Sequence, residues 1–268
     1  MLSVILKAGF VISLLSVWAC SGEKSSRLTS DAAKPGLSKT IETTAADGLT
    51  IYGETYFGGL DASAPLILLF HQGGSNGRGE YTQIASWLNK NGFRAIAWDL
   101  RSGGETYGES NRTAAGLPAG SAPGYCAVAP DLQAAIDYVT ANGLGESAIL
   151  WGSSYSAALV FGAAAANPER TAGVIAFSPS SGGPLENCRA RQWINHIDAP
   201  VFVLRPASEM DRDSSIEQRN ILTASRAKFL VVENGVHGSS MLLDERTQHD
   251  MSAARAAVLS WLEAATEK

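Results

Sequence analysis

The sequence predicts an α/β fold in which a mostly parallel central sheet is flanked by helices. Short apolar runs of strand length recur along the chain, and segments with helical periodicity separate them. The runs are nearly continuous in apolar residues, as expected for strands buried on both faces of a parallel sheet. Most successive runs begin about 30 residues apart, the length of one β-α-β unit. The runs occupy residues 66–70, 95–98, 148–151, 174–177, 201–204 and 229–232.

The remaining elements are predicted by turn residues and helical spacing. Residues 40–57 are expected to form a β-hairpin, because Asp47-Gly48 is a favourable turn between two strand-like segments. Apolar residues spaced i, i+3, i+4 and i+7 predict an amphipathic helix that Gly92 ends. Pro130 fits the first turn of a second such helix. The helical patterns cover residues 81–88, 132–139 and 254–262.

A long insertion, residues 102–128, interrupts this regular spacing and is rich in Gly, Ser, Ala and Pro. A loop of this length in a compact domain is usually functional or mobile. It follows a strand, so it leaves the sheet at the carboxyl edge, where ligands bind in open α/β sheets. Residues 181–196 are also expected to overhang this edge. Their Arg189, Arg191 and Trp193 would either bind a substrate carboxylate or simply cover the surface.

Composition limits the class of protein. The chain has 268 residues, of which 45% are hydrophobic and 18% are charged, and this fits one α/β domain rather than a disordered or fibrous protein. The formal net charge is −5, and Lys and Arg form no run. A nucleic-acid partner is therefore not expected.

The N-terminus has the features of an export signal. Residues 1–19 contain one early lysine and then an uncharged apolar stretch that is too short to span a bilayer. The stretch ends in VWAC, which resembles a bacterial lipobox, so Cys20 is expected to be lipidated. The alternatives are ordinary secretion with cleavage near Ala19 and a retained anchor helix. Residues 20–38 then form a flexible tether to a domain at 39–268, and we expect a lipid-anchored protein of the cell envelope that faces the periplasm.

A candidate nucleophile follows the third core strand. The sequence Gly152-Ser153-Ser154-Tyr155-Ser156 matches the G-x-S-x-G nucleophile elbow except at its last position. In this register Ser154 is the nucleophile on a strained strand-to-helix turn, and Ser153 is only its neighbour. The alternative is that both serines are small residues that let a strand and a helix pack closely.

A serine nucleophile needs a base and an acid, and both candidates follow later strands. His237 lies between glycines just past the last apolar run, which places it at the same edge as Ser154. For the acid, Glu209 lies five residues after the 201–204 strand, where hydrolases with this elbow usually carry the carboxylate. Asp211 is the alternative. Asp213 is expected to begin the next helix. The closely spaced acids do not form a glycine-supported calcium loop, and no metal site is expected.

Two backbone amides are expected to form an oxyanion hole. One belongs to Tyr155, the residue after the nucleophile. The other comes from the glycine-rich turn after the first core strand, where Gly73 is the expected donor and Gln72 the alternative. His71 is expected to be structural. The turn contains neither of the glycine patterns that bind phosphate.

Together these motifs resemble the α/β-hydrolases over about residues 40–266, and most of all the compact dienelactone-hydrolase-like branch without a large cap domain. The resemblance rests on HQGG at 71–74, the Asp99-Leu100-Arg101-Ser102-Gly103 turn, the elbow and GVHG at 235–238. The dienelactone hydrolases proper use a cysteine where this chain has Ser154, so their substrate is not carried over. Ser156 in place of the final glycine is a second departure.

The predicted function is hydrolysis of a carboxylic ester or related acyl bond of a small molecule through a Ser154 acyl-enzyme, without a cofactor. A catalytically silent, lipid-anchored binding protein on the same fold is one alternative. An acyltransferase with the same triad is another. Cys126 and Cys188 are candidates for a disulfide in an oxidising compartment, although the sequence does not show whether they pair.

Overall fold

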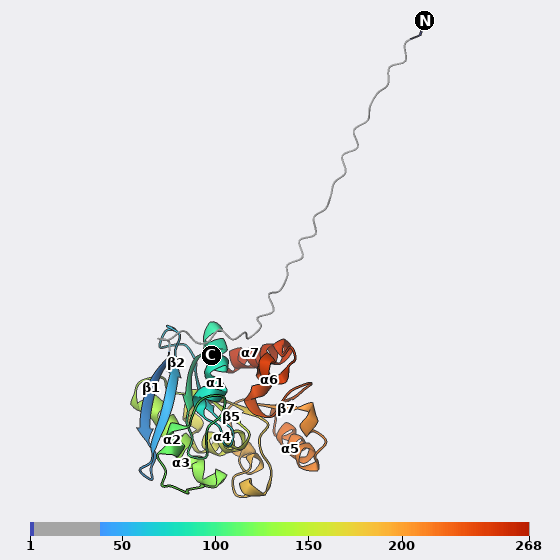
Figure 1. Cartoon of the computed structure of the whole chain (residues 1–268). Coiled ribbons are helices and arrows are strands. Elements are labelled where there is room, and N and C mark those ends of the chain that lie inside the picture. The colour runs from blue at the N-terminus through green and yellow to red at the C-terminus, as the bar shows by residue number, and fades with distance from the viewer. Residues whose placement is uncertain (3–37, 268) are drawn as a thin grey trace.

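The computed structural model describes residues 1, 2 and 38–267. Residues 38–267 form an eight-stranded sheet between two layers of helices (Figure 1). The predicted signal peptide beyond Leu2, the lipidation site Cys20 and the tether up to residue 37 lie outside the described residues. Within the described part of the chain, no helix has both the length and the apolar character that crossing a membrane requires.

The sheet confirms the predicted α/β architecture. Its strand order is β1-β2-β4-β3-β5-β6-β7-β8. The β1–β2 hairpin and the β2–β4 pair are antiparallel, and every other pair is parallel. The strands are β1 (Ser38–Thr44), β2 (Thr50–Tyr56), β3 (Leu66–Phe70), β4 (Arg94–Trp98), β5 (Ala148–Ser153), β6 (Thr171–Phe177), β7 (Val201–Pro206) and β8 (Lys228–Val232).

Helices cover both faces of the sheet. Helices α1 and α7 pack on one face, and α3, α4 and α5 pack on the other. The helices are α1 (Gly77–Lys90), α2 (Arg112–Ala115), α3 (Ala129–Ala141), α4 (Tyr155–Ala166), α5 (Asp213–Ala224), α6 (Asp244–Thr247) and α7 (Ser252–Thr266). The 3₁₀ turns are η1 (Tyr125–Val128), η2 (Pro168–Arg170), η3 (Gly183–Leu185), η4 (Ala190–Gln192), η5 (Ile194–His196), η6 (Ala207–Glu209) and η7 (Gly238–Leu242).

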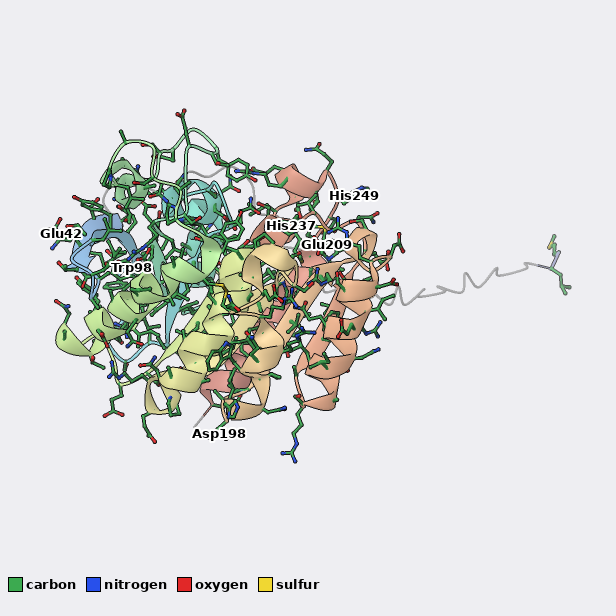
Figure 2. The ribbon with its side chains drawn as sticks, turned by 90° about the horizontal axis from the view of Figure 1, so that it is seen from below. Glu42, Trp98, Asp198, Glu209, His237 and His249 are labelled. Carbon is green, nitrogen blue, oxygen red and sulfur yellow. A yellow bond between two sulfur atoms is a disulfide. The ribbon has the colours of Figure 1, made fainter. Side chains whose placement is uncertain are left out.

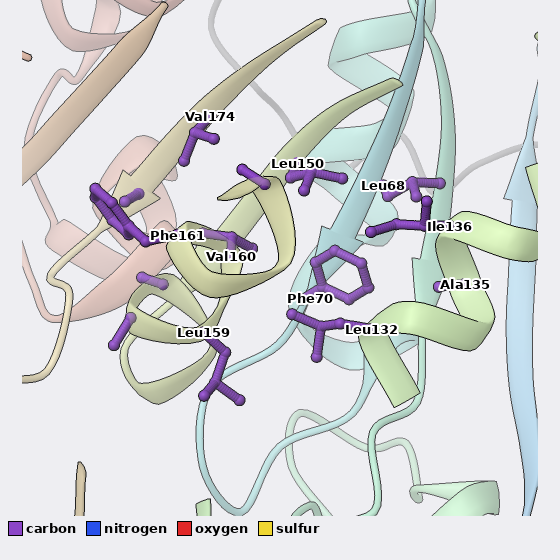
Figure 3. Close-up of a cluster of buried hydrophobic side chains, with 14 of the residues drawn as sticks. Leu68, Phe70, Leu132, Ala135, Ile136, Leu150, Leu159, Val160, Phe161 and Val174 are labelled. Atoms are coloured by element: carbon purple, nitrogen blue, oxygen red, sulfur yellow. The ribbon is translucent and has the colours of Figure 1, made fainter. Parts of the chain in front are cut away.

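Each central strand contributes to two hydrophobic cores, which explains the continuous apolar runs. Successive side chains of a strand point to opposite faces of the sheet. Leu68 and Phe70 of β3 therefore pack with α3 and α4, as Figure 3 shows, whereas Ile67 and Leu69 pack with α1 and α7. All five side chains of β3 are buried, so a polar residue at any of these positions would be costly unless it found a hydrogen-bond partner.

Candidate active site

The parallel strands bring four separate segments to one edge of the sheet. Residues 71–74 follow β3, Ser154 follows β5, Glu209 lies in turn η6 after β7, and His237 lies after β8. The strands run in the same direction, so their carboxyl ends meet at this edge. Segments that are far apart in the sequence are therefore close in space.

Ser154 is at the point of the turn between β5 and α4. Its backbone has φ 61° and ψ −115°, a conformation that costs a residue other than glycine about 1–3 kcal/mol. Gly152 is required just before the turn, because a Cβ there would lie 2.5 Å from the Cα of Ala157. The strained residue, Ser154, is half-buried, whereas Ser153 is completely buried. Of the two serines, Ser154 is the one that faces the site.

Ser154, His237 and Glu209 form a continuous series of hydrogen bonds. His237 Nε2 lies 2.8 Å from Ser154 Oγ, and His237 Nδ1 lies 2.5 Å from Glu209 Oε1. Figure 2 shows Glu209 and His237 next to each other. An ionised carboxylate can only accept a hydrogen bond, so Nδ1 carries the proton and Nε2 is left to accept from the serine hydroxyl. In this tautomer the imidazole can take the proton of Ser154.

Glu209 is held ionised by its surroundings. Its second oxygen, Oε2, accepts a hydrogen bond of 2.6 Å from Arg205, whose guanidinium also bonds the side chain of Gln218. Burial by itself raises the pKa of Glu209, but the hydrogen bond from His237 and the charge of Arg205 outweigh it and leave the pKa below its ordinary value. Asp211, the alternative acid, is exposed, and Asp213 begins α5.

The structure distinguishes the candidate amides at residues 72 and 73. The amide of Gln72 donates a hydrogen bond of 2.9 Å to the carboxylate of Glu80. Within the described residues, the amide of Gly73 has no acceptor. Tyr155 is the first residue of α4, and amides in the first turn of a helix lack an intrahelical partner. The amides of Gly73 and Tyr155 are thus left for a bound molecule.

His71 supports the turn instead of facing the site. It is completely buried, and its Nε2 accepts hydrogen bonds from the amide of Leu100 at 2.8 Å and from the side chain of Asn111 at 3.0 Å. Its Nδ1 then donates to the carbonyl oxygen of Gln72 at 2.7 Å. Burial lowers the pKa of His71, which keeps the ring neutral in this arrangement.

A cavity of about 620 Å³ lies beside the 71–74 turn. Gly74 and Pro184 line it together with residues of the 102–128 insertion, among them Tyr125, so the insertion does overhang this edge. A disulfide joins Cys126 of the insertion to Cys188 of the neighbouring loop. The cavity lies next to the site and not over the triad, because Ser154, His237 and Glu209 do not line it. The candidate substrate contacts Arg189, Arg191 and Trp193 do not line it either.

Sequence reasoning missed two residues near the site. Glu80 lies in the first turn of α1, where an acidic residue ordinarily needs no further explanation, and Tyr125 lies in the irregular insertion. Neither belongs to a motif, and only the tertiary structure places them beside the 71–74 turn. Among residues 38–267, no group of three His, Cys, Asp or Glu side chains is arranged to hold a metal ion.

Comparisons with known proteins agree with this fold. A family model described as serine aminopeptidase, S33, matches residues 62–241. No curated protein matches the chain significantly. An esterase from Pyrococcus furiosus is 15% identical with a TM-score of 0.59, and the match covers 83% of this chain and 90% of that chain. A dienelactone hydrolase from Anabaena variabilis is 17% identical with a TM-score of 0.62, covering 84% and 96%. An acylaminoacyl peptidase from Pyrococcus horikoshii is 14% identical with a TM-score of 0.60, covering 84% and 41%.

Proposed function

The chain belongs to the serine aminopeptidase S33 family and is an α/β-hydrolase, and on this premise we propose that it hydrolyses carboxylic esters through an acyl-enzyme on Ser154. The observation that carries the proposal is the hydrogen-bonded series from Ser154 through His237 to Glu209. The strained backbone of Ser154 and the amides of Gly73 and Tyr155 support it.

In the proposed first step, Ser154 Oγ attacks the ester carbonyl carbon and its proton passes to His237 Nε2. Glu209 stabilises the resulting imidazolium. The carbonyl oxygen becomes negative and accepts hydrogen bonds from the amides of Gly73 and Tyr155. The bond to the alcohol oxygen then breaks, and His237 returns the proton to that oxygen. Water repeats these steps on the acyl-enzyme, which releases the carboxylic acid and restores Ser154.

The cavity beside the 71–74 turn offers no carboxylate to the free N-terminus of a peptide. An aminopeptidase must bind a protonated amino group, for which a carboxylate is the natural partner. Among the described residues that line the cavity, Arg101 alone is charged, and it is a cation. Its guanidinium is already engaged by Asp47 and Asp131. The cavity therefore suits an uncharged part of a substrate.

Labelling by a fluorophosphonate tests the proposal. Intact mass should increase by one phosphonyl group for the wild type and for the matched control Ser153→Ala, and should not change for Ser154→Ala. The wild type should also hydrolyse p-nitrophenyl esters, and Ser154→Ala should lose about 10³-fold or more of that activity. A folded wild-type protein that takes no label, or an equally labelled Ser154→Ala, would contradict the proposal.

We also propose that Cys20 is lipidated and anchors the enzyme to the cell envelope, a proposal that rests on the sequence around that cysteine. Full-length wild type and Cys20→Ala expressed in bacteria should then differ in intact mass and in membrane fraction. Equal mass and equal fractionation would exclude the anchor.

A further inference from the structure

Tyr125 packs against Gly73 on the side where any other residue would carry its Cβ. A Cβ at position 73 would lie 2.7 Å from Tyr125 Oη and 3.3 Å from its Cε1 and Cζ. Gly73 does not have a positive φ, so backbone conformation does not demand glycine here. The close approach of Tyr125 means instead that a side chain at position 73 would displace the Tyr125 hydroxyl.

Two restraints hold Tyr125 in this position. Its ring stacks on the ring of Tyr155, with the centroids 4.5 Å apart and an angle of 17° between the planes. The next residue, Cys126, is tied to Cys188 by the disulfide. Tyr125 is thereby fixed against both residues whose amides we assign to the oxyanion hole, Gly73 and Tyr155.

The hydroxyl of Tyr125 is available to a ligand. Within residues 38–267, no group forms a hydrogen bond with it, and the half-buried side chain lines the 620 Å³ cavity. A phenolic O–H is a good donor, and Tyr125 presents it beside Gly73 at the wall of this cavity. By contrast, the hydroxyl of Tyr155 is buried, and Tyr155 does not line this cavity.

We propose that Tyr125 donates a third hydrogen bond to the carbonyl oxygen of the substrate as that oxygen becomes negative, an inference that rests on the function proposed above. An oxygen bound by the Gly73 amide lies about 3 Å from that nitrogen. A hydroxyl that already contacts Gly73 is within reach of the same oxygen. The donor is fixed before the substrate binds, so it stabilises the negative charge without reorganising.

The rate of phosphonylation by a fluorophosphonate tests this role without a known substrate, because the phosphonyl oxygen takes the place of the carbonyl oxygen. Tyr125→Phe keeps the stacked ring and the disulfide and removes only the hydroxyl. We expect its labelling rate to fall by about tenfold to 100-fold. With a p-nitrophenyl ester, kcat should fall by a similar factor while KM stays unchanged. The control is Tyr138→Phe, another half-buried tyrosine, whose ring packs edge-on against Trp98.

The outcomes separate the inference from the proposed function. A labelled wild type and an equally fast Tyr125→Phe would overturn the role of Tyr125 and leave the hydrolase function standing. A folded wild type that takes no label would overturn both. Gly73→Ala gives a second test, because its Cβ would push the Tyr125 hydroxyl away. Its loss of rate should be smaller in the Tyr125→Phe background than in the wild type, and equal losses would contradict the proposal.

Discussion

Replacing Glu80 with glutamine should stabilise the protein at alkaline pH. Glu80 is 1% exposed, and its carboxylate accepts the amide hydrogen of Gln72 at 2.9 Å. Burial raises the pKa of Glu80 to about 7, from an ordinary value of 4.5, while the hydroxyls of Ser153 and Ser75, the Gln72 amide and the charge of His237 act in the opposite direction. Glutamine keeps an acceptor for the amide and never ionises.

The size and sign of the effect follow from proton linkage. The pKa rises from 4.5 to about 7, and a difference of one in pKa corresponds to about 1.4 kcal/mol. Between pH 4.5 and 7 the folded protein keeps a proton that the unfolded chain has lost, so the free energy of unfolding falls as the pH rises. The raised pKa of Glu80 therefore lowers the free energy of unfolding by about 3 kcal/mol above pH 7 and by about 1 kcal/mol at pH 5.

Urea unfolding at pH 5 and pH 8 measures this cost. The difference in unfolding free energy between Glu80→Gln and the wild type should grow by about 2 kcal/mol in favour of the variant from pH 5 to pH 8. Titrating groups that do not interact with Glu80 are common to both proteins and cancel in the difference. Glu42→Gln, at an exposed position, should show no such change. A difference that is the same at both pH values would refute the reasoning.

Three further predictions concern the site and its surroundings. Glu209→Gln should lower kcat by about 10²–10⁴-fold in steady-state ester hydrolysis, and Asp211→Asn should change it less than about twofold. Replacing Cys126 and Cys188 together with serine should lower the free energy of unfolding by about 4 kcal/mol, because the disulfide closes a loop with a sequence separation of 62. Gly124→Leu places a side chain in open space at the cavity wall, so it should reduce kcat/KM for bulky esters while acetate esters are spared. Equal losses across the ester series would contradict this use of the cavity.

The sheet could be predicted from the sequence because its signal is local. A strand covered on both faces needs apolar side chains at every position, and β3 and β5 show this directly. The hairpin was indicated by its turn residues. The order Ser154, acid, His237 could be predicted because each residue follows the carboxyl end of a strand. Each of these inferences needed only the residues next to one strand in the sequence.

The choice between neighbouring residues could not be predicted, because it depends on the direction in which each side chain points. Glu209 ends the 3₁₀ turn η6 and is buried against Arg205, while Asp211, only two residues later, is exposed. Glu80 has the sequence context of an ordinary acid in the first turn of a helix. Its burial comes from the 71–74 turn, which is packed on it from another element.

Ser156 explains how the elbow forms without its final glycine. The usual glycine avoids a clash where the helix passes close to the strands, but the side chain of Ser156 is completely buried and fully used. Its hydroxyl donates a hydrogen bond of 2.7 Å to the carbonyl oxygen of Phe70 and accepts one of 2.9 Å from the amide of Ser153. Phe70 immediately precedes the 71–74 turn, and Ser153 immediately precedes Ser154. The serine therefore links the ends of β3 and β5, and so joins the segment that carries the Gly73 amide to the one that carries the nucleophile.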